Sequence, residues 1–307
     1  MNKLYLLIAV TALSLIWLFV FFVPNEMRFR PANPISQSPA EVGLAFESFT
    51  LVPSDRDIEL AGWWMPADNA QATLVFIHGG GSNRHSEFFQ SLEFYTAMVT
   101  KGVSVAVVDL RNHGDSDTDD RGLQFGATEK WDAIALIEWA RKKAPYKPLY
   151  AMGISMGGAT LIHAADQGAL TDGMILLDPL LNTHDVITQG IWVETGLPPA
   201  VFGPAAWAAT TWHGMPGGKQ QASEIAARLN QPILLLQDPD DPVTRAVYAR
   251  SVAARNQKIQ YWESPPVRHE DAASLSWRGR WGSHVTGFVL FPELVLEQIF
   301  AFMNLSP

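Results

Sequence analysis

A serine flanked by glycines, Ser155 in the pentapeptide Gly-Ile-Ser-Met-Gly, is the residue of this sequence best placed to act as a nucleophile. An apolar run typical of a buried strand precedes it at residues 149–154, and helical spacing follows it at 156–166. Glycines let a strand and a helix approach closely around a strained turn, which exposes the serine hydroxyl above the sheet. The pattern therefore predicts that Ser155 is a catalytic nucleophile.

A serine hydroxyl attacks only when a base accepts its proton, and an imidazole base needs a carboxylate to fix its tautomer. Asp238, Asp240 and Asp241 follow the apolar run 233–237. An acid at the carboxyl end of a strand lies at the same edge of the sheet as Ser155. We predict that Asp241 is this acid, because it precedes a proline that can occupy the first position of the next helix. Asp238 and Asp240 are the alternatives, and we expect them to cap the helix.

The base must be a histidine, and of the eight in the chain only His269 and His284 follow both the serine and the aspartates. His284 stands eight residues before Pro292, which opens the last expected helix. A base on the loop that leads into this helix is the arrangement we favour, so His284 is the predicted base. His269, which follows the last expected strand more closely, is the alternative.

Two backbone N–H groups are needed to stabilise the oxyanion that forms when a serine attacks a carbonyl. The amide of Met156 directly follows the nucleophile at a helix N-terminus, where the helix dipole adds to its effect. A second amide is expected from the sequence His-Gly-Gly-Gly-Ser at residues 78–82, with Gly80 as the donor. A phosphate-binding loop is the other interpretation of these glycines, but the Lys-Ser/Thr pair of a P-loop is missing.

Short apolar runs alternate with helical spacing through most of the chain, which predicts an α/β fold with a mostly parallel sheet covered by helices on both faces. The expected strands are residues 46–52, 58–64, 73–78, 103–109, 149–154, 174–178, 233–237 and 259–263, the first two as an antiparallel pair. The expected helices are residues 87–100, 128–143, 156–166, 242–255 and 292–303.

Residues 181–231 separate two expected strands by more than a plain crossover requires, so we expect an inserted helical cap there. Trp192, Phe202 and Trp207 lie in this insertion. We expect these aromatic side chains to bind substrate, as the lining of a pocket for an acyl or aryl group.

The N-terminus carries an apolar run at residues 4–23, which has no charge and matches the ~30 Å hydrocarbon core at ~1.5 Å per residue. We predict a single-pass transmembrane anchor. A cleaved signal peptide is the alternative, but its apolar region is usually only ~7–15 residues, and Val-Pro-Asn-Glu at residues 23–26 offers no small-x-small cleavage site. Lys3 before the span nearly balances Arg28 and Arg30 after it, so the membrane face stays open.

The domain organisation follows from this anchor. Residues 1–30 form the predicted transmembrane segment, and residues 31–44, rich in proline, serine and asparagine, form an extended linker. Residues 45–307 form the catalytic domain, with the cap inserted at about 181–231.

Composition excludes several classes of protein. The 307 residues carry a net charge of -9, and no segment clusters the lysines and arginines that a nucleic-acid binder needs. The chain has no cysteine, which excludes a disulfide scaffold, a cysteine nucleophile and a thiolate metal site.

The order of these motifs resembles the α/β-hydrolase superfamily, and is most similar to its serine aminopeptidase-like and monoacylglycerol lipase-like branch. The resemblance covers about residues 45–307 and implies an eight-stranded sheet, a variable cap and a Ser-Asp-His triad. It assigns the loop of residues 109–116 to structure rather than catalysis. Two departures stand out: Gln237-Asp238 replaces a His-Gly that often precedes the acid, and the stretch after the last strand is longer than usual. The matching motifs are His-Gly-Gly at 78–80, Asp-Leu-Arg-Asn-His-Gly-Asp-Ser at 109–116, Gly-Ile-Ser-Met-Gly-Gly at 153–158, Asp241 and His284.

We therefore expect a membrane-anchored serine hydrolase that cleaves a small-molecule or lipid-like ester through an acyl-enzyme, without a metal or an organic cofactor. A peptidase of the same fold is the first alternative, because Asp185 and Glu194 in the cap could hold a substrate amine. A non-catalytic, membrane-tethered binding module is the second, although serine, acid and histidine are all present. Dehalogenases and epoxide hydrolases of this fold need an aspartate where Ser155 stands.

Overall fold

Eight strands form one sheet at the centre of the computed structural model, which describes residues 2–305 apart from the side chains of Asn2, His269, Glu270 and Ala272. The strand order is β1-β2-β4-β3-β5-β6-β7-β8, with β1 and β2 antiparallel to their neighbours and the rest parallel. The predicted sheet is confirmed. The strands are β1 Glu47–Leu51, β2 Leu60–Met65, β3 Ala72–Ile77, β4 Val103–Val108, β5 Leu149–Ile154, β6 Gly173–Leu177, β7 Ile233–Gln237 and β8 Ile259–Glu263.

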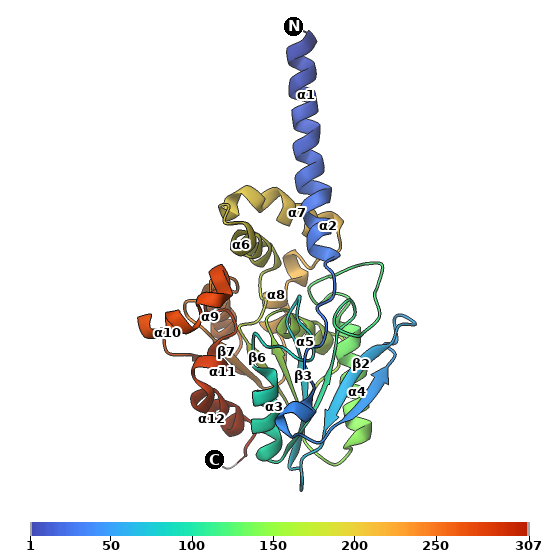
Figure 1. Ribbon diagram of the computed structural model, residues 1–307, viewed down its shortest axis with the longest axis vertical. Coiled ribbons are helices and arrows are strands. Elements are labelled where there is room, and N and C mark those ends of the chain that lie inside the picture. Colours follow the sequence, from blue (N-terminus) through green and yellow to red (C-terminus); the bar gives the residue numbers. More distant parts are fainter. Residues whose placement is uncertain (1, 306–307) are drawn as a thin grey trace.

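Helices cover both faces of the sheet (Figure 1). Neighbouring residues of a strand point to opposite faces, so Val75 joins one buried core and Phe76 the other. This explains why the central strands are apolar without alternation. The first core is closed by α4 Lys130–Lys143, α5 Met156–Asp166, α8 Ala222–Ala226 and α9 Ala246–Arg255, and the second by α3 Ser91–Thr100, α11 Gly287–Leu290 and α12 Pro292–Phe302.

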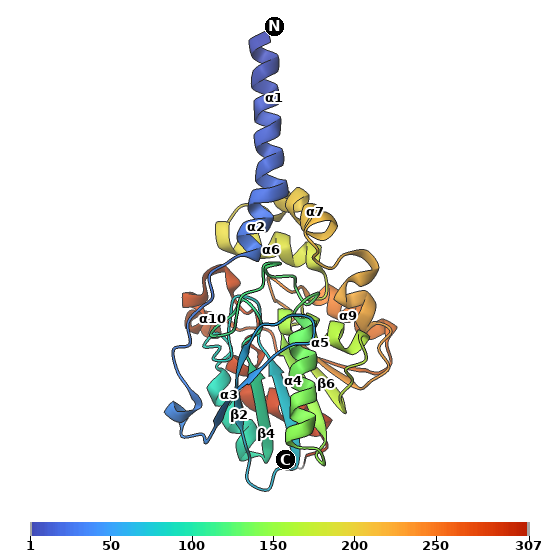
Figure 2. The same ribbon diagram turned by 90° about the vertical axis from the view of Figure 1, so that its right-hand side faces the viewer.

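The segment between β6 and β7 forms the inserted cap, which lies above the carboxyl ends of the parallel strands (Figures 1 and 2). Asn182 begins its first helix by accepting a hydrogen bond from the N–H of Asp185 at 3.0 Å. Its elements before α8 are α6 Thr183–Thr195, η3 Pro199–Phe202, α7 Gly203–Trp212 and η4 Gly218–Gln220. After β8 come two short helices that the sequence did not predict, α10 His269–Ser274 and η5 Ser276–Trp281, and η5 contacts α6 of the cap.

The N-terminus is one long helix that rises out of the body of the protein, as α1 Asn2–Trp17, the π-helical turn η1 Leu18–Phe22 and α2 Val23–Arg28 (Figure 2). An 18-residue window within its stretch Lys3–Arg28 has a mean hydropathy of 2.8, and the stretch is long and apolar enough to cross a membrane. The lower end of the helix packs on the cap, where the rings of Phe19 and Phe202 lie 6.2 Å apart. His213 donates a hydrogen bond to the carbonyl of Val20 at 2.6 Å, which fixes the helix to the end of α7.

The segment after this helix is extended, as expected, but it is packed along the domain rather than free. We call residues 29–38 the strap. The strap leads into η2 Pro39–Val42, where Pro39 is buried, and the side chains of Ile35 and Leu44 pack on the second core. Composition alone predicted an extended linker that does not pack, because prolines and small polar residues carry no periodic apolar pattern. The side chains of Pro39, Ile35 and Leu44 nevertheless pack against the domain.

Candidate active site

Ser155 occupies a strained turn between β5 and α5, with φ 49° and ψ -117°. A non-glycine residue rarely adopts a positive φ, so this conformation must be imposed by its surroundings. Gly153 and Gly157 make the turn possible. A Cβ atom at Gly153 would lie 2.4 Å from the carbonyl oxygen of Gly157, and one at Gly157 would lie 2.2 Å from that of Ile77.

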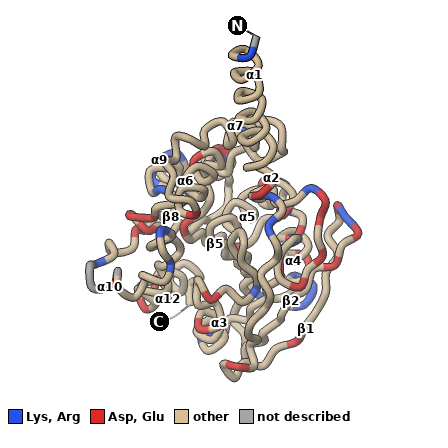
Figure 3. The backbone as a smooth tube through the Cα atoms, turned by 45° about the horizontal axis from the view of Figure 1, so that its top comes forward, with Lys and Arg blue, Asp and Glu red and all other residues tan. Residues whose placement is uncertain are grey.

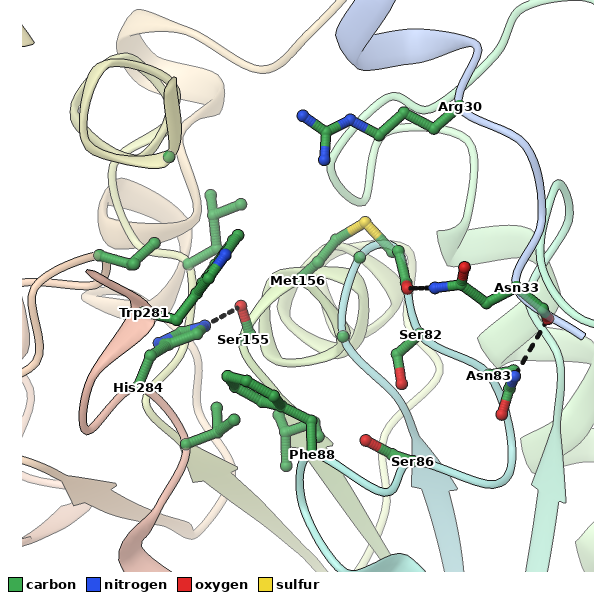
Figure 4. Close-up of a pocket in the computed structure, with 18 of the residues that line it drawn as sticks. Arg30, Asn33, Ser82, Asn83, Ser86, Phe88, Ser155, Met156, Trp281 and His284 are labelled. Carbon is green, nitrogen blue, oxygen red and sulfur yellow. Dashed lines mark hydrogen bonds between the residues drawn. The ribbon is translucent and has the colours of Figure 1, made fainter. Parts of the chain in front are cut away.

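Three residues from separate loops meet at this turn. The Nε2 atom of His284 lies 3.0 Å from the hydroxyl oxygen of Ser155 (Figure 4). Its Nδ1 atom lies 2.7 Å from a carboxylate oxygen of Asp241. Because a carboxylate only accepts, Nδ1 carries the proton and Nε2 is left to accept from the serine hydroxyl. The structure thus brings the predicted nucleophile, base and acid together in one hydrogen-bonded series.

Asp241 is held as a buried anion. Its carboxylate accepts hydrogen bonds from the N–H groups of Val243 and Thr244 at 2.7 and 2.8 Å, and from the Thr244 hydroxyl at 2.6 Å. Burial alone would raise the pKa of Asp241, but His284 and these hydrogen bonds lower it overall. An ionised carboxylate at this position stabilises an imidazolium when the base takes up a proton.

The alternative residues lie elsewhere. Asp238 is buried and accepts the N–H of Asp240 at 2.9 Å, while Asp240 is exposed. The side chain of His269 lies outside the described residues. Among the described side chains, the imidazole beside Ser155 is that of His284.

Asp178, at the end of β6, is a residue of the site that the sequence analysis missed. Its two carboxylate oxygens accept the N–H of Asp238 at 2.7 Å and the N–H of Val285 at 3.0 Å. Asp178 therefore joins the loop of the acid to the loop of the base. Burial, with Asp241 and Asp238 nearby, raises the pKa of Asp178 well above its ordinary value. The sequence offered one signal for this residue: a carboxylate that directly follows β6, the strand next to β5, which leads to Ser155.

Arg278 holds the backbone of the base, His284, by a hydrogen bond. Its guanidinium donates to the carbonyl oxygen of His284 at 2.9 Å and to that of Phe88 at 3.0 Å, and it lies 3.4 Å from the centre of the Phe88 ring. Burial lowers the pKa of Arg278 to about 10. The long stretch after β8 thus contributes to positioning His284.

The two expected oxyanion donors come from the helix that follows the nucleophile and from the loop after β3. Met156 is the first residue of α5, so its N–H has no carbonyl partner within the helix. Gly80 lies in the loop after β3, and a Cβ atom there would be 3.3 Å from the sulfur of Met156. The next residue of this loop, Gly81, donates its N–H to Nε2 of His113 at 3.1 Å, which gives the loop of residues 109–116 a structural role.

A pocket of about 670 Å³ opens above these residues (Figure 4). One face of α6, at the helical spacing of Val186, Gly190 and Glu194, forms one wall. Phe88 and Trp281 form another. The lining is mainly apolar, with the hydroxyl of Ser155 and the imidazole of His284 at its floor.

The three cap aromatics take other positions, and in the described part of the chain none of them lines the pocket. Trp192 follows Gly190 by two residues, which turns it to another side of α6. Phe202 is buried against the N-terminal helix, and Trp207 is 50% exposed on α7. Phe202 thus contacts the N-terminal helix and Trp207 lies on the surface of the cap, while aromatic residues of other segments, Phe88 and Trp281, line the pocket.

Comparison with known proteins agrees with the architecture. The structure is similar to the esterase Pf2001 of Pyrococcus furiosus, with a TM-score of 0.69 and 18% identity over 89% of this chain and 98% of that one. A family model described as serine aminopeptidase, S33, matches residues 68–197. The chain belongs to the α/β-hydrolase superfamily. An acylaminoacyl peptidase also shares the fold of this α/β hydrolase, with a TM-score of 0.57 and 19% identity over 82% of this chain and 41% of that one.

Sequence relatives of this α/β hydrolase include two lipases. Lysophosphatidylserine lipase ABHD12 of Danio rerio is 25% identical over 41% of this chain and 32% of the relative. Monoglyceride lipase of Mus musculus is 27% identical over 43% of this chain and 42% of the relative. The matched region thus spans less than half the length of either relative.

Proposed function

We propose that the protein is a serine hydrolase that cleaves a carboxylic ester through an acyl-enzyme. His284 takes the proton of the Ser155 hydroxyl as its oxygen attacks the ester carbonyl, and the amides of Met156 and Gly80 stabilise the oxyanion. Asp241 orients the imidazole and stabilises the imidazolium. The proton then passes from His284 to the departing alkoxide, and a water molecule activated by His284 releases the acid from Ser155.

The observation that carries this proposal is the series Ser155, His284 and Asp241 at the floor of a mainly apolar pocket. An apolar pocket favours an acyl chain, and the printed names of the lipases and of the esterase to which the chain is similar point the same way. The chemical class of the substrate is therefore a small-molecule or lipid-like ester.

The membrane anchor is part of the proposal. The helix Lys3–Arg28 supports insertion, and α7 packs beside its lower end. Helices α1 and α7 carry no acidic side chain, and α7 carries no basic one either (Figure 3). Trp207 and Trp212 are 50% and 59% exposed on α7, and tryptophan is enriched at membrane interfaces. We propose that residues 1–30 anchor the protein and that α7 lies at the level of the lipid headgroups.

A peptidase is the second candidate, because Glu194 lines the pocket and could bind a substrate amine. Both carboxylates are paired with an arginine, Glu194 with Arg30 at 3.5 Å and Asp185 with Arg245, and of the two only Glu194 is among the described residues that line the pocket. A peptidase would favour substrates whose positive charge reaches Glu194.

A panel of nitrophenyl esters of graded acyl length, run beside aminoacyl anilides, separates the two candidates. We expect ester cleavage with kcat/KM rising with acyl length to a maximum. Cleavage confined to aminoacyl anilides, and lost in Glu194→Gln, would replace the esterase by the peptidase.

A further inference from the structure

The strap lies against the loop that carries Gly80. Asn33 of the strap donates a side-chain hydrogen bond to the carbonyl of Gly81, and Asn83 of the loop donates to the carbonyls of Asn33 and Pro34, each at 3.1 Å (Figure 4). The two segments are therefore joined in both directions. They are about fifty residues apart in sequence, so this contact belongs to the tertiary structure.

Ser36 extends the contact to the far end of the loop. Its hydroxyl donates to a carboxylate oxygen of Glu87 at 2.7 Å and lies 3.0 Å from Nδ1 of His85. The loop of residues 79–87 is thus held by the strap near both of its ends.

The strap also closes one side of the pocket. Arg30, Asn33 and Ser36 line the pocket together with Met27 at the end of the anchor helix. In Figure 4, Arg30 extends from the strap over the pocket above Met156, and its guanidinium lies 3.5 Å from the carboxylate of Glu194 on α6. A substrate in the pocket would contact the segment that leads to the anchor.

We infer that the strap contributes to catalysis. Through Asn33 and Ser36 it positions the loop of residues 79–87, which carries the oxyanion donor Gly80, and it completes the wall of the pocket. This inference rests on the proposed function. Gly81 has its N–H fixed by His113 and its carbonyl fixed by Asn33, so the two successive peptide groups that follow Gly80 are each held by one hydrogen bond. Loss of the strap contact leaves the second of these peptide groups without its support.

The physical consequence falls on kcat rather than on KM. An oxyanion donor acts on charge that develops in the transition state, so a displaced donor slows the reaction while the ground-state complex binds as before. Asn33 and Ser36 are positioning residues in this scheme, because they act through the loop and not on the reacting atoms.

The test uses the full-length protein in detergent and nitrophenyl acetate, whose short acyl group reaches little of the pocket wall. We expect Asn33→Ala and Ser36→Ala each to lower kcat roughly 3- to 10-fold, the effect of one hydrogen bond, with KM changed less than about twofold. Ser36→Thr, which keeps the hydroxyl, should restore kcat. Ser38→Ala is the matched control: this hydroxyl of the same segment bonds to Glu41, away from the pocket, and its loss should leave kcat unchanged.

Two results would overturn the inference. One is a kcat for Asn33→Ala and Ser36→Ala within about twofold of wild type. The other is an equal loss in Ser38→Ala, which would mean that any damage to the segment acts through stability. Ser155→Ala, assayed in parallel, distinguishes a failure of the strap inference from a failure of the proposed function. Ester cleavage that persists in this variant rejects the proposed function itself, whatever the strap variants do.

Discussion

Gly190 on the pocket face of α6 offers a direct way to reduce the room for an acyl chain. In the described structure, a Cβ atom at this position would meet no heavy atom within 4 Å. Gly190→Leu would therefore place about four carbon atoms in the pocket without a backbone clash, and each methylene of substrate that it excludes costs ~0.8 kcal/mol. Four excluded methylenes amount to about 3 kcal/mol, or a roughly 200-fold loss of kcat/KM for the longest esters.

The assay is the chain-length profile of kcat/KM for nitrophenyl esters, measured beside the free energy of unfolding. We expect the maximum to move to shorter chains by about three or four carbons. Replacing a glycine inside a helix should at the same time stabilise the protein by ~0.5–1 kcal/mol, so lost activity cannot reflect unfolding. Gly203→Leu is the control, because that cap glycine also has open space around it but does not line the pocket. An unchanged profile in Gly190→Leu would refute our assignment of the acyl site.

Three further predictions test the base, the electrostatics and the anchor. His284→Ala should lower kcat by roughly 10⁴-fold while His269→Ala keeps most activity, and the reverse result would move the base to His269. Burial raises the pKa of Asp238 from its ordinary value of 3.8 to about 6, so its contribution to stability is full below pH 4 and is lost as the pH rises through 6. Asp238→Asn should therefore raise the unfolding midpoint at pH 7.5 but not at pH 4, and an equal effect at both pH values would argue against this. The full-length protein should stay with membranes through a carbonate wash, whereas recovery of a chain that begins soon after Val23 would indicate a signal peptide.

The sheet could be predicted from the sequence because its central strands are buried on both faces, and burial leaves continuous apolar runs that turns and helices interrupt. The turn at Ser155 could also be predicted, because the space there requires glycine at residues 153 and 157. A Cβ atom at either position would lie only 2.2–2.4 Å from a backbone carbonyl oxygen. Asp241 and His284 followed from their order in the chain and from the strand and helix beside them. The structure places His284 beside the serine and Asp241 beside His284.

Other features leave a weaker trace in the sequence. The sequence of the cap did not determine which side of each helix faces the pocket. Trp192 is two positions away from Gly190 on α6, and only Gly190 of these two lines the pocket among the described residues. Asp178 acts through backbone amides of two distant loops, and its position directly after β6 was the one sign of it in the sequence. The strap binds through a few polar side chains such as Asn33, and composition describes such a segment only as a linker.

The central claim is that Ser155 is an activated nucleophile, and a fluorophosphonate probe tests it most directly. The full-length protein should gain the mass of one phosphonyl group, on the peptide that contains Ser155, and the label should be absent in Ser155→Ala together with ester cleavage. His284→Ala should label far more slowly, because the serine then lacks its base. A label on another residue, or ester cleavage that survives Ser155→Ala, would contradict the account.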